Sequence, residues 1–590
     1  MLKRSCGTTY SYPRQAKAYR FNRTRTRSGS SDLAVAAGYA RLFESLESRR
    51  LLSASLLEAT AIQEPNTVDQ LLELASGKQK NELTLQSTTS GSATSSPTPL
   101  SAPTMLKTGL QPPPANVITQ PGSGSESGSG PGSRSPADFR YVLRPGTGFT
   151  GPTATPAARG TGLGATRPAI ADWDAVPYQS FSGALNVGVV AFHINEAGIE
   201  RVDFSANGGP WTSVREMALN PQTRVVEYFA TLRAELFSTG PVEVRAIAYP
   251  TVGQPVVLEP LKLYADPNDT FAARTRYVST SGSDTTGNGT AAAPFRTVAK
   301  AASSLQSQYG NADGGTIYLG AGTWDGGTGA VSTPNTYLTL KAAPGLARSA
   351  VTINSFSGTP PTKIRVDGVT IKTSIPNLTV TNPRYAWYSN SDMRGDSRAD
   401  NINWSQTLWT GSGQNFVVTT YATDVHIYNV LDGFRHGRLI RNATVNGIGS
   451  NFFSDTKTVI NVTAYDVDPS GINPSDPPHP DVYQAYSTRR DIIIYGLTAT
   501  QDLAYARGLA MDNGLHNVAI VNANVDNRPA WGAVFEFGNR SGGDTDNVLI
   551  KDCSFAGGAL WNTPGPTSNF VIENTTFTNP PGPLAGVIYR

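Results

Sequence analysis

Cysteine, charge and long apolar segments are all scarce in this sequence. Its 590 residues include only two cysteines, Cys6 and Cys553, which excludes a disulfide framework and a cysteine-based zinc site. No apolar run reaches about 18 residues, the minimum for a membrane-spanning helix. Charged residues make up 16% and hydrophobic residues 38% of the chain. This composition excludes a coiled coil, which needs many charged and apolar residues in heptads.

Glycine and proline are abundant instead. The 58 glycines and 41 prolines together are 99 of the 590 residues, about one residue in six. Both residues interrupt helices and favour turns, so the sequence predicts short strands, turns and linkers rather than a mainly helical protein. A chain of this length is also expected to form several domains.

The positive charge is concentrated at the N-terminus. Residues 1–50 contain eleven Lys or Arg and three Asp or Glu, a net charge of +8, whereas the whole chain has +3. The remaining residues therefore carry a net charge of −5. A folded part with this balance is not expected to bind nucleic acid through a basic surface.

A short segment near the N-terminus resembles a known export segment. Residues 43–54 read FESLESRRLLSA, which is similar to the LEPR-XLL segment near the start of many exported planctomycete proteins, with Ser45 and Ser48 in place of the usual prolines. The resemblance implies export to the cell surface or the medium. A short basic amphipathic helix is the alternative. We assign residues 1–55 to this segment.

A low-complexity stretch and a β-rich region follow. Residues 81–170 contain 61 Gly, Pro, Ser, Thr or Ala among 90 residues, so we predict that residues 56–171 form a disordered linker. Apolar residues then alternate, as in Val187, Val189 and Ala191, and Asn-Gly and Pro-containing turns separate the runs. This pattern predicts an Ig-like β-sandwich over residues 172–268, which serves as a spacer or binds a ligand.

The region 272–590 begins with a characteristic order of elements. Val298, Ala301, Ala302 and Leu305 have helical spacing, and the strand-like segment TIYLGAGTW follows at residues 316–324. This order resembles the opening of right-handed parallel β-helix proteins of the pectate-lyase-like group, especially polysaccharide lyase family 9. The resemblance implies that the helix caps the open end of the coil. A β-propeller is the alternative, but its repeats are longer and more regular.

A repeated pattern supports the β-helix. An apolar-x-apolar triplet lies between Asn, Asp or Gly residues in DVHIYN, DIIIYG, NVAIVN, NVLIKD and NFVIEN. The first apolar positions are 425, 460, 492, 518, 548 and 570, so the steps are unequal, as expected when loops differ in length. We predict about ten to twelve turns at roughly 25–30 residues each. The Asn, Asp or Gly after each triplet predicts a left-handed turn with stacked Asn side chains.

The resemblance also implies a chemistry. The lyase family mostly cleaves uronic-acid polymers by β-elimination, which needs positive charge or calcium beside the uronate, a base, and a proton donor to the leaving oxygen. The long step between positions 460 and 492 contains DPPHPDVYQ, in which His479, Asp481 and Tyr483 share one face of a strand. The motifs of common pectate lyases and polygalacturonases are absent, so the resemblance assigns no role securely.

Adjacent coils lie about 4.8 Å apart, so residues that are distant in sequence are able to converge. As candidate catalytic residues we identify His479, Asp481, Lys457 and Arg507. As candidate calcium ligands we identify Asp481, Asp512 and Glu536. The alternative is that the acidic and Asn residues only form turns and solvated surface, especially at Asp512-Asn513-Gly514.

Candidate substrate-binding residues come from two places. Arg435, His436 and Tyr483 belong to the coils around the candidate site. The insertion between residues 382 and 416 adds Trp387, Trp404 and Trp409, whose rings would stack on sugar faces if exposed. A structural aromatic cluster under a long loop explains the same residues equally well.

The sequence thus predicts an exported, monomeric, carbohydrate-active protein. Its expected partner is an acidic polysaccharide, cleaved by metal-assisted β-elimination with calcium as the cofactor. The alternatives are a non-catalytic glycan-binding or adhesion protein, which would use the same long groove, and a purely structural coat protein.

Overall fold

The computed structural model describes the C-terminal part of the chain. It covers residues 141–146, 169–194, 198–374, 384–402, 404, 407–408, 416–470, 472, 480–485, 489–501, 507–511, 514–527, 534–537, 545–558, 560–562, 567–580 and 584–590. The chain divides into two units, residues 1–125 and 126–590, and all described residues belong to the second. The export-like segment and most of the predicted linker lie outside the described residues.

The first folded part is the expected β-sandwich. One sheet has the order β1 (Ile170–Asp174), β3 (Ala184–Phe192), β7 (Val225–Arg233) and β6 (Ala218–Asn220). The other has the order β2 (Ser180–Phe181), β10 (Leu261–Ala265), β8 (Gly240–Pro250), β4 (Ile199–Ala206) and β5 (Thr212–Val214), with β9 (Val256–Val257) beside β8. Alternate residues such as Val187, Val189, Phe204 and Val244 face one another in a fully buried core, as expected for two packed antiparallel sheets.

A short part of the predicted linker is ordered against this sandwich. The backbone N–H of Leu143 donates to the carbonyl of Thr231 over 2.8 Å, and the N–H of Thr231 donates back to Tyr141 over 2.8 Å. Leu143 is fully buried in the sandwich core. The prediction of a disordered linker is therefore wrong for residues 141–146, because one apolar side chain there fills a place in the core that composition alone does not reveal.

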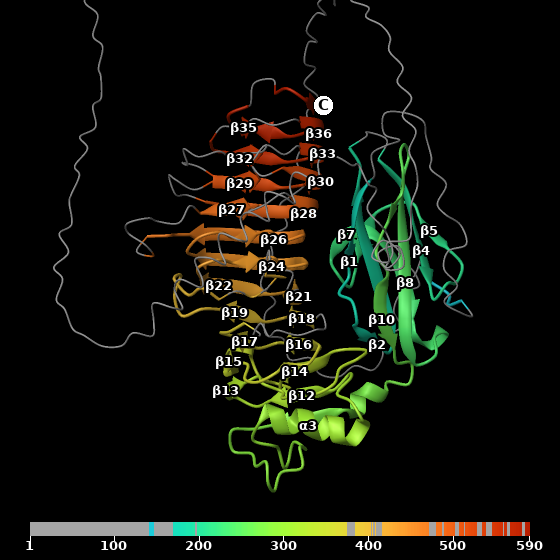
Figure 1. Cartoon of the computed structure of the whole chain (residues 1–590), viewed down its shortest axis with the longest axis vertical. Helices are drawn as coiled ribbons and strands as arrows, with labels where there is room; N and C mark the ends of the chain where they lie inside the picture. Colours follow the sequence, from blue (N-terminus) through green and yellow to red (C-terminus); the bar gives the residue numbers. More distant parts are fainter. Residues whose placement is uncertain are drawn as a thin grey trace, which may run out of the picture. The chain divides into compact units, whose positions relative to one another are not determined.

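The second folded part is a parallel β-helix. Twelve successive parallel pairings connect one ladder of described strands, which Figure 1 shows as a stack from α3 to the C-terminus. The ladder consists of β11 (Thr275–Val278), β12 (Thr316–Leu319), β14 (Leu338–Ala342), β16 (Lys363–Asp367), β18 (Arg384–Ser389), β21 (Phe416–Thr423), β24 (Leu439–Ile448), β26 (Thr458–Val467), β28 (Arg489–Thr500), β30 (Leu515–Val521), β33 (Thr545–Lys551), β36 (Thr567–Glu573) and β38 (Val587–Tyr589).

Two further ladders complete the coils. The second contains β13 (Gly322–Asp325), β15 (Val351–Ser355), β17 (Thr370–Ile371), β19 (Asp392–Arg394), β22 (His426–Val430), the C-terminal halves of β24, β26 and β28, and then β31 (Asn524–Asp526), β34 (Ser554–Ala556) and β37 (Thr576–Phe577). The third contains β23 (Phe434–Arg435), β25 (Phe453–Ser454), β27 (Asp481–Gln484), β29 (Arg507–Met511), β32 (Phe535–Phe537) and β35 (Leu560–Asn562). One apolar core runs through the coils.

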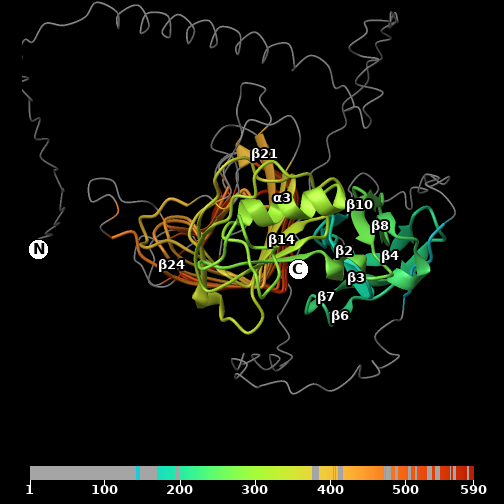
Figure 2. The same ribbon diagram turned by 90° about the horizontal axis from the view of Figure 1, so that it is seen from below.

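The predicted capping helix is confirmed. Helix α3 (Val298–Tyr309) begins where the Thr297 hydroxyl accepts a hydrogen bond from the backbone N–H of Lys300, and it ends at Gly310, whose φ is +80°. Its buried residues are the four predicted ones, Val298, Ala301, Ala302 and Leu305, which join the core of the coil. Seen along the coil in Figure 2, α3 lies across the end of the stacked strands, so it shields apolar side chains that would otherwise face water.

Left-handed residues mark both ends of a short strand segment in seven successive coils. The pairs with positive φ are 424 and 429, 442 and 447, 461 and 466, 491 and 496, 517 and 522, 547 and 552, and 569 and 574, always five residues apart. The predicted left-handed turn after each triplet is confirmed, and an equivalent residue precedes it. Only Asn, Asp and Gly occupy these positions, because other side chains pay a steric cost there.

These corners also reveal a coil that the sequence pattern hid. Asn442 and Gly447 bound the segment ATVN, and the next leading corner is Asn461, so Val462 rather than Ile460 is the equivalent of Val425 and the predicted 35-residue step spans two coils. Side-chain hydrogen bonds connect the leading corners from coil to coil, from Asn517 Nδ2 to Asp491 Oδ1 (3.1 Å) and from Asn547 Nδ2 to Asn517 Oδ1 (2.7 Å). The sequence predicted such bonds at the corners after the triplets, where Asn574 Nδ2 donates to Asp552 Oδ1 over 2.6 Å, and the leading corners form them as well.

The sandwich covers the outer side of the first ladder. Leu439, Ile460, Ile493 and Leu549 alternate with core residues and point away from the core, yet they are buried in a cluster with Ile170, Val176 and Val190 of the sandwich. This contact explains the continuous apolar runs DIIIY and NVLI, since a strand covered on both sides needs no polar face.

Buried charges accompany this apolar contact. The Arg438 guanidinium pairs with Asp172, one of its bonds measuring 2.5 Å, and Arg441 Nη1 donates to Asp174 Oδ1 over 2.6 Å. Glu227 lies beside Asp174 and accepts hydrogen bonds from Asn220 and Thr223. Burial raises the pKa of Glu227 well above its usual range, and the neighbouring Asp174 charge adds to this effect. Burial raises the pKa of Asp174 as well, so both carboxyl groups of this pair hold a proton more tightly than they do in water.

The corner ladder generates a stability prediction. Asn547→Ala loses the bond to Asn517 and replaces Asn, which tolerates left-handed backbone, with a residue that does not, so it should lower the free energy of unfolding by about 2 kcal/mol. Asn547→Gly loses only the side-chain bond and should cost about 1 kcal/mol. Urea unfolding of the full chain measures both values. Equal losses for Ala and Gly would show that the left-handed corner imposes no conformational constraint.

The buried carboxyl pair generates a pH prediction. A carboxyl group whose pKa rises on folding holds its proton more tightly in the folded protein, so its stabilising contribution is full below the unfolded pKa and declines as pH rises above about 4.5. Glu227→Gln carries a permanent hydrogen-bond donor and should lose less stability between about pH 4.5 and 7 than the parent chain does. Glu243→Gln, in a surface pair with Arg245, is the control. Parallel pH profiles for Glu227→Gln and the parent chain would contradict the prediction.

Candidate functional site

The third ladder of the β-helix separates core residues from polar residues. Its inward row is Phe434, Phe453, Tyr483, Leu509 and Phe535, all fully buried and stacked in register. The next residue of each strand forms a second row on the other side, which consists of Arg435, Ser454, Gln484, Ala510 and Glu536. The alternation of a strand thus places a polar row outside an aromatic core.

Asp481, Arg507 and Glu536 form the most connected charge cluster of this ladder. Asp481 and Arg507 are register partners on β27 and β29. The guanidinium binds Asp481 through two parallel bonds, Nε to Oδ1 (2.7 Å) and Nη2 to Oδ2 (2.9 Å), and its Nη1 donates to Glu536 Oε2 over 3.3 Å. Both carboxylates are buried, whereas the Arg507 side chain is 19% exposed. Two buried anions therefore fix the direction of one partly exposed cation.

A polar network continues this cluster along the ladder. The backbone N–H of Asp481 donates to Asn451 Oδ1 over 3.0 Å, and Asn451 Nδ2 donates to Gln484 Oε1 over 3.0 Å. The backbone N–H of Asn451 donates to Asp432, whose carboxylate pairs with Arg435 Nη1 at 2.9 Å. Three coils of the third ladder are thus connected by side chains. Asn451 was not predicted because it belongs to the coil that the repeat pattern hid.

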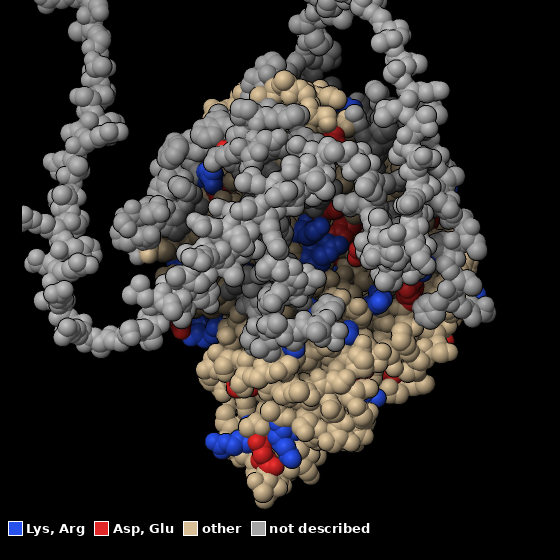
Figure 3. Space-filling model, viewed as in Figure 1, with Lys and Arg blue, Asp and Glu red and all other residues tan. Residues whose placement is uncertain are grey.

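Two further predicted cationic residues lie at the corner after β23 and β25. His436 has a φ of 53°, and its Nδ1 is 3.4 Å from the buried Asp455 carboxylate. The backbone N–H of Lys457 donates to the carbonyl of Gly437, so Lys457 lies one coil beyond His436, and its side chain is exposed. Arg435, His436 and Arg507 thus each have a buried acidic partner, and Lys457 is an exposed residue of the same region. On the face shown in Figure 3, charged side chains similarly occur in small groups that contain both signs.

Three predicted substrate contacts need correction. Tyr483 does not share an exposed face with Asp481, since its ring is in the core and its hydroxyl donates to the Thr456 carbonyl over 2.6 Å. Trp404 is buried and packs edge-on against Tyr388. Trp387 lies under the Arg365 guanidinium at 4.0 Å, and its indole N–H donates to Thr423. The structural alternative is therefore correct for Trp404, whereas Trp387 packs in the same way but also lines a hollow on the first ladder.

The remaining candidates are His479, Trp409 and Asp512, and all three lie outside the described residues. The predicted calcium ligands Asp481 and Glu536 are close, but both direct an oxygen at Arg507, which already balances part of their charge. Among the described residues, no group of three or more His, Cys, Asp or Glu side chains is arranged to hold a metal ion. Within the same residues, no helix is long and apolar enough to cross a membrane.

Comparisons with known proteins assign no function to this chain. No protein-family model and no curated protein matches the sequence, so neither the lyase resemblance nor the export segment gains support there. Among solved structures, a GH136 lacto-N-biosidase from Eubacterium ramulus aligns with 51% of this chain and 68% of its own, at 9% identity and a TM-score of 0.29. A catalytic domain of a GH87 α-1,3-glucanase in complex with nigerose covers 66% of this chain and 78% of its own, at 11% identity and a TM-score of 0.24. Similarity at this level carries no information about chemistry.

The charge cluster generates a stability prediction. Asp481→Ala removes the two-bond partner of Arg507 and should lower the free energy of unfolding by about 3 kcal/mol. Asp432→Ala is the matched comparison, because the buried Asp432 makes one bond to Arg435 instead of two, so a smaller loss of about 2 kcal/mol is expected. Urea unfolding at neutral pH compares the two. A larger loss for Asp432→Ala would show that Asp481 does not anchor the cluster.

Proposed function

We propose that this protein is a carbohydrate-active β-helix protein that binds an acidic polysaccharide across the third ladder and cleaves it by β-elimination. The observation that supports this most directly is the Arg507 guanidinium, which is partly exposed and held by two buried carboxylates. Such a preorganised cation pays little reorganisation cost when it meets an anionic sugar. Arg435, three coils before Arg507 in the third ladder, would contact a further carboxylate of the same polymer.

Elimination at a uronic acid begins with removal of the C5 proton by a base. The C4–O bond then breaks, a double bond forms between C4 and C5, and the leaving oxygen receives a proton, so no water is consumed. The negative charge that develops on the uronate carboxylate needs a nearby cation. In this proposal Arg507 takes the role that the family resemblance assigned to calcium, and Lys457, in its uncharged form, is the candidate base that accepts the C5 proton.

A non-catalytic glycan-binding protein is the second candidate. Its support is that Asp481 and Glu536 both pair with the same guanidinium, which leaves neither carboxylate placed as an independent acid or base. A stack of coils also offers equivalent binding positions about 4.8 Å apart, which suits a long polymer with or without cleavage. For either function we propose a secreted or cell-surface location, which rests on the export-like segment at residues 43–54.

The elimination proposal is tested by incubating the full chain with a panel of uronic-acid polymers, with and without added calcium. We expect a rise in ultraviolet absorbance from unsaturated products, and we expect Arg507→Gln to lower the rate at least about 100-fold, as for loss of a charge-stabilising group. Arg394→Gln is the matched control, since Arg394 is on β19 of the second ladder and lies over the Tyr428 ring. Its rate should equal that of the parent chain.

The competing outcomes are separable. Retention of the polymers without unsaturated product, abolished by Arg507→Gln, would favour the binding protein. New reducing ends without the absorbance rise would indicate hydrolysis and refute elimination. Equal rates for Arg507→Gln and Arg394→Gln would remove the third ladder from the active site.

A further inference from the structure

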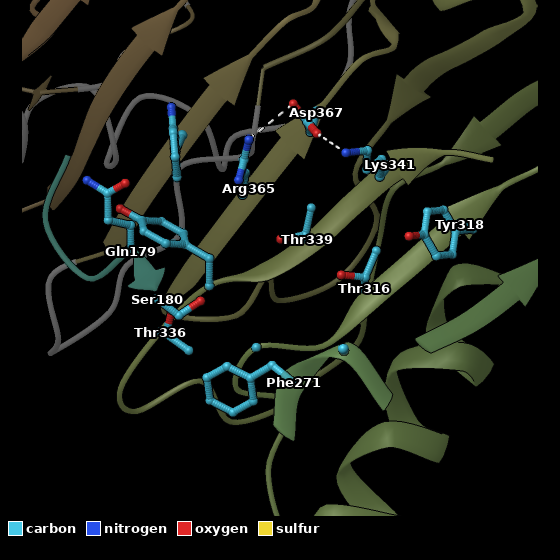
Figure 4. A pocket seen from close by; sticks show the side chains of 14 residues that line it. Gln179, Ser180, Phe271, Thr316, Tyr318, Thr336, Thr339, Lys341, Arg365 and Asp367 are labelled. Carbon is cyan, nitrogen blue, oxygen red and sulfur yellow. Dashed lines mark hydrogen bonds and ion pairs between the residues drawn. The ribbon is translucent and has the colours of Figure 1, made fainter. Parts of the chain in front are cut away.

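A polar hollow lies on the outer side of the first ladder, near α3. It measures about 270 Å³ and is bounded by β12, β14, β16 and β18 of the β-helix, by the short helix η4 (Thr270–Ala273), and by two sandwich residues, Ser180 at the start of β2 and Gln179 before it. Figure 4 shows the side chains of this hollow, with Tyr318, Lys341 and Asp367 on one side and Phe271 at its edge. None of its residues belongs to the third ladder.

Strand register arranges the hollow as two parallel rows. Thr316, Thr339 and Arg365 are successive partners on β12, β14 and β16, and the next outward row is Tyr318, Lys341 and Asp367. Each row therefore repeats about every 4.8 Å. The hollow thus has one row that begins with hydroxyls and ends with a guanidinium, beside a row with an aromatic ring and two opposite charges.

Asp367 holds both cations in place. Its carboxylate is 2.9 Å from Lys341 Nζ and 3.3 Å from Arg365 Nη2, and it also accepts hydrogen bonds from Ser389 and Asn390. Burial opposes ionisation, but Arg365, Asn390 and Lys341 together lower the pKa of Asp367 to about 2. One carboxylate facing two cations leaves the hollow with a net charge of +1.

The cations keep donors for a ligand. Arg365 stacks over Trp387 at 4.0 Å and donates through Nε to Ser389 Oγ over 2.9 Å, so its plane is fixed. Among the described residues, no hydrogen bond engages its Nη1. Lys341 is 47% exposed and has three N–H groups, of which the pair with Asp367 needs one. An anionic group placed between the two cations would therefore meet prepared donors.

The rest of the hollow suits a sugar ring. Within the described part of the chain, the hydroxyls of Thr316, Thr339 and Tyr318 make no hydrogen bond, so they are available to sugar hydroxyls. The Tyr318 ring is held by stacking on Tyr277, with centroids 5.0 Å apart, which presents a fixed aromatic surface. Carboxylate donors, hydroxyl partners and an aromatic surface in one hollow define a ligand that is both anionic and polyhydroxylated.

We propose that this hollow binds one uronic-acid unit of an acidic glycan, with its carboxylate between Lys341 and Arg365 and its ring beside Tyr318. The glycan class is that of the proposed function, but the site consists of different residues. Because Gln179 and Ser180 form one wall, the sandwich takes part in glycan binding rather than acting only as a spacer. The site would hold the polymer while the third ladder acts on another segment.

The test uses calorimetric titration of the full chain carrying Arg507→Gln, so that the third-ladder site is already impaired. The probes are linear trisaccharides of galacturonic, glucuronic and mannuronic acid, each with its carboxyl-reduced, neutral counterpart. We expect at least one acidic trisaccharide to bind at one site and its neutral counterpart to bind at least tenfold more weakly. Adding Lys341→Met should weaken the acidic ligand about tenfold, and Tyr318→Leu about fivefold.

Arg348→Met is the matched control, because Arg348 is an exposed cation on a nearby turn that pairs with Asp392 outside the hollow. It should change affinity less than twofold. Absence of binding to all acidic trisaccharides, equal affinity for the neutral counterparts, or equal effects of Lys341→Met and Arg348→Met would each overturn the proposal. Elimination by the Lys341→Met chain with native Arg507 is measured in parallel. If this chain still cleaves the polymers, the third ladder acts without the hollow. If the parent chain cleaves none of them but the trisaccharides bind, only the proposal for the third ladder fails.

Discussion

Strand register along the coil is the constraint on which both sites depend. Parallel strands place residue upon residue at a constant spacing, so a charge on one coil meets its partner on the next. In the seven later coils this register is fixed by pairs of left-handed residues five positions apart, joined at several coils by Asn and Asp side chains. Asp481 meets Arg507 through such a register, and Lys341 meets Asp367 through the same geometry nearer to α3.

The sequence predicted the scaffold well because its signals are local. The stripe of α3, the corner residues and the apolar triplets each reflect one element and its immediate neighbours, and the structure confirms them. The direction of Tyr483 could not be predicted in the same way. Whether a strand residue faces in or out depends on where the strand begins, and the separation in sequence between the end of β26 at Val467 and the start of β27 at Asp481 gives no register. The hidden coil at Asn442 and Gly447 was missed because its apolar positions, Ala443 and Val445, are small and give a weak pattern.

The contact between sandwich and coil explains why the outward residues of the first ladder change from polar to apolar along its length. Near α3 its outward residues are Thr316, Thr339 and Arg365, whereas later coils place Ile460, Ile493 and Leu549 at the outward positions. The apolar section is buried against the sandwich, and the polar section is the hollow that the sandwich only borders. The boundary of the contact with the sandwich therefore divides the first ladder into two parts. One part packs against the sandwich, and the other has hydroxyl groups that make no hydrogen bond within the described residues. The runs of isoleucine and valine in the sequence indicated this contact, since a strand that faces water is expected to have polar residues at alternate positions.

Asp481 and Asp367 are buried carboxylates, and each pairs with a cation that is exposed or half-buried. Such ion pairs contribute little to the stability of the fold. Removing an ion from water costs several kcal/mol, and well-packed apolar residues of equal volume would stabilise the fold at least as well. The buried carboxylate instead orients the guanidinium or ammonium group, so that its remaining N–H donors point in a fixed direction. At Arg441, whose side chain is only 10% exposed, the same pairing with Asp174 joins the sandwich to the coil. Exposure of the cation, rather than the presence of the ion pair, therefore separates the two proposed glycan sites from a structural contact made of the same residue types.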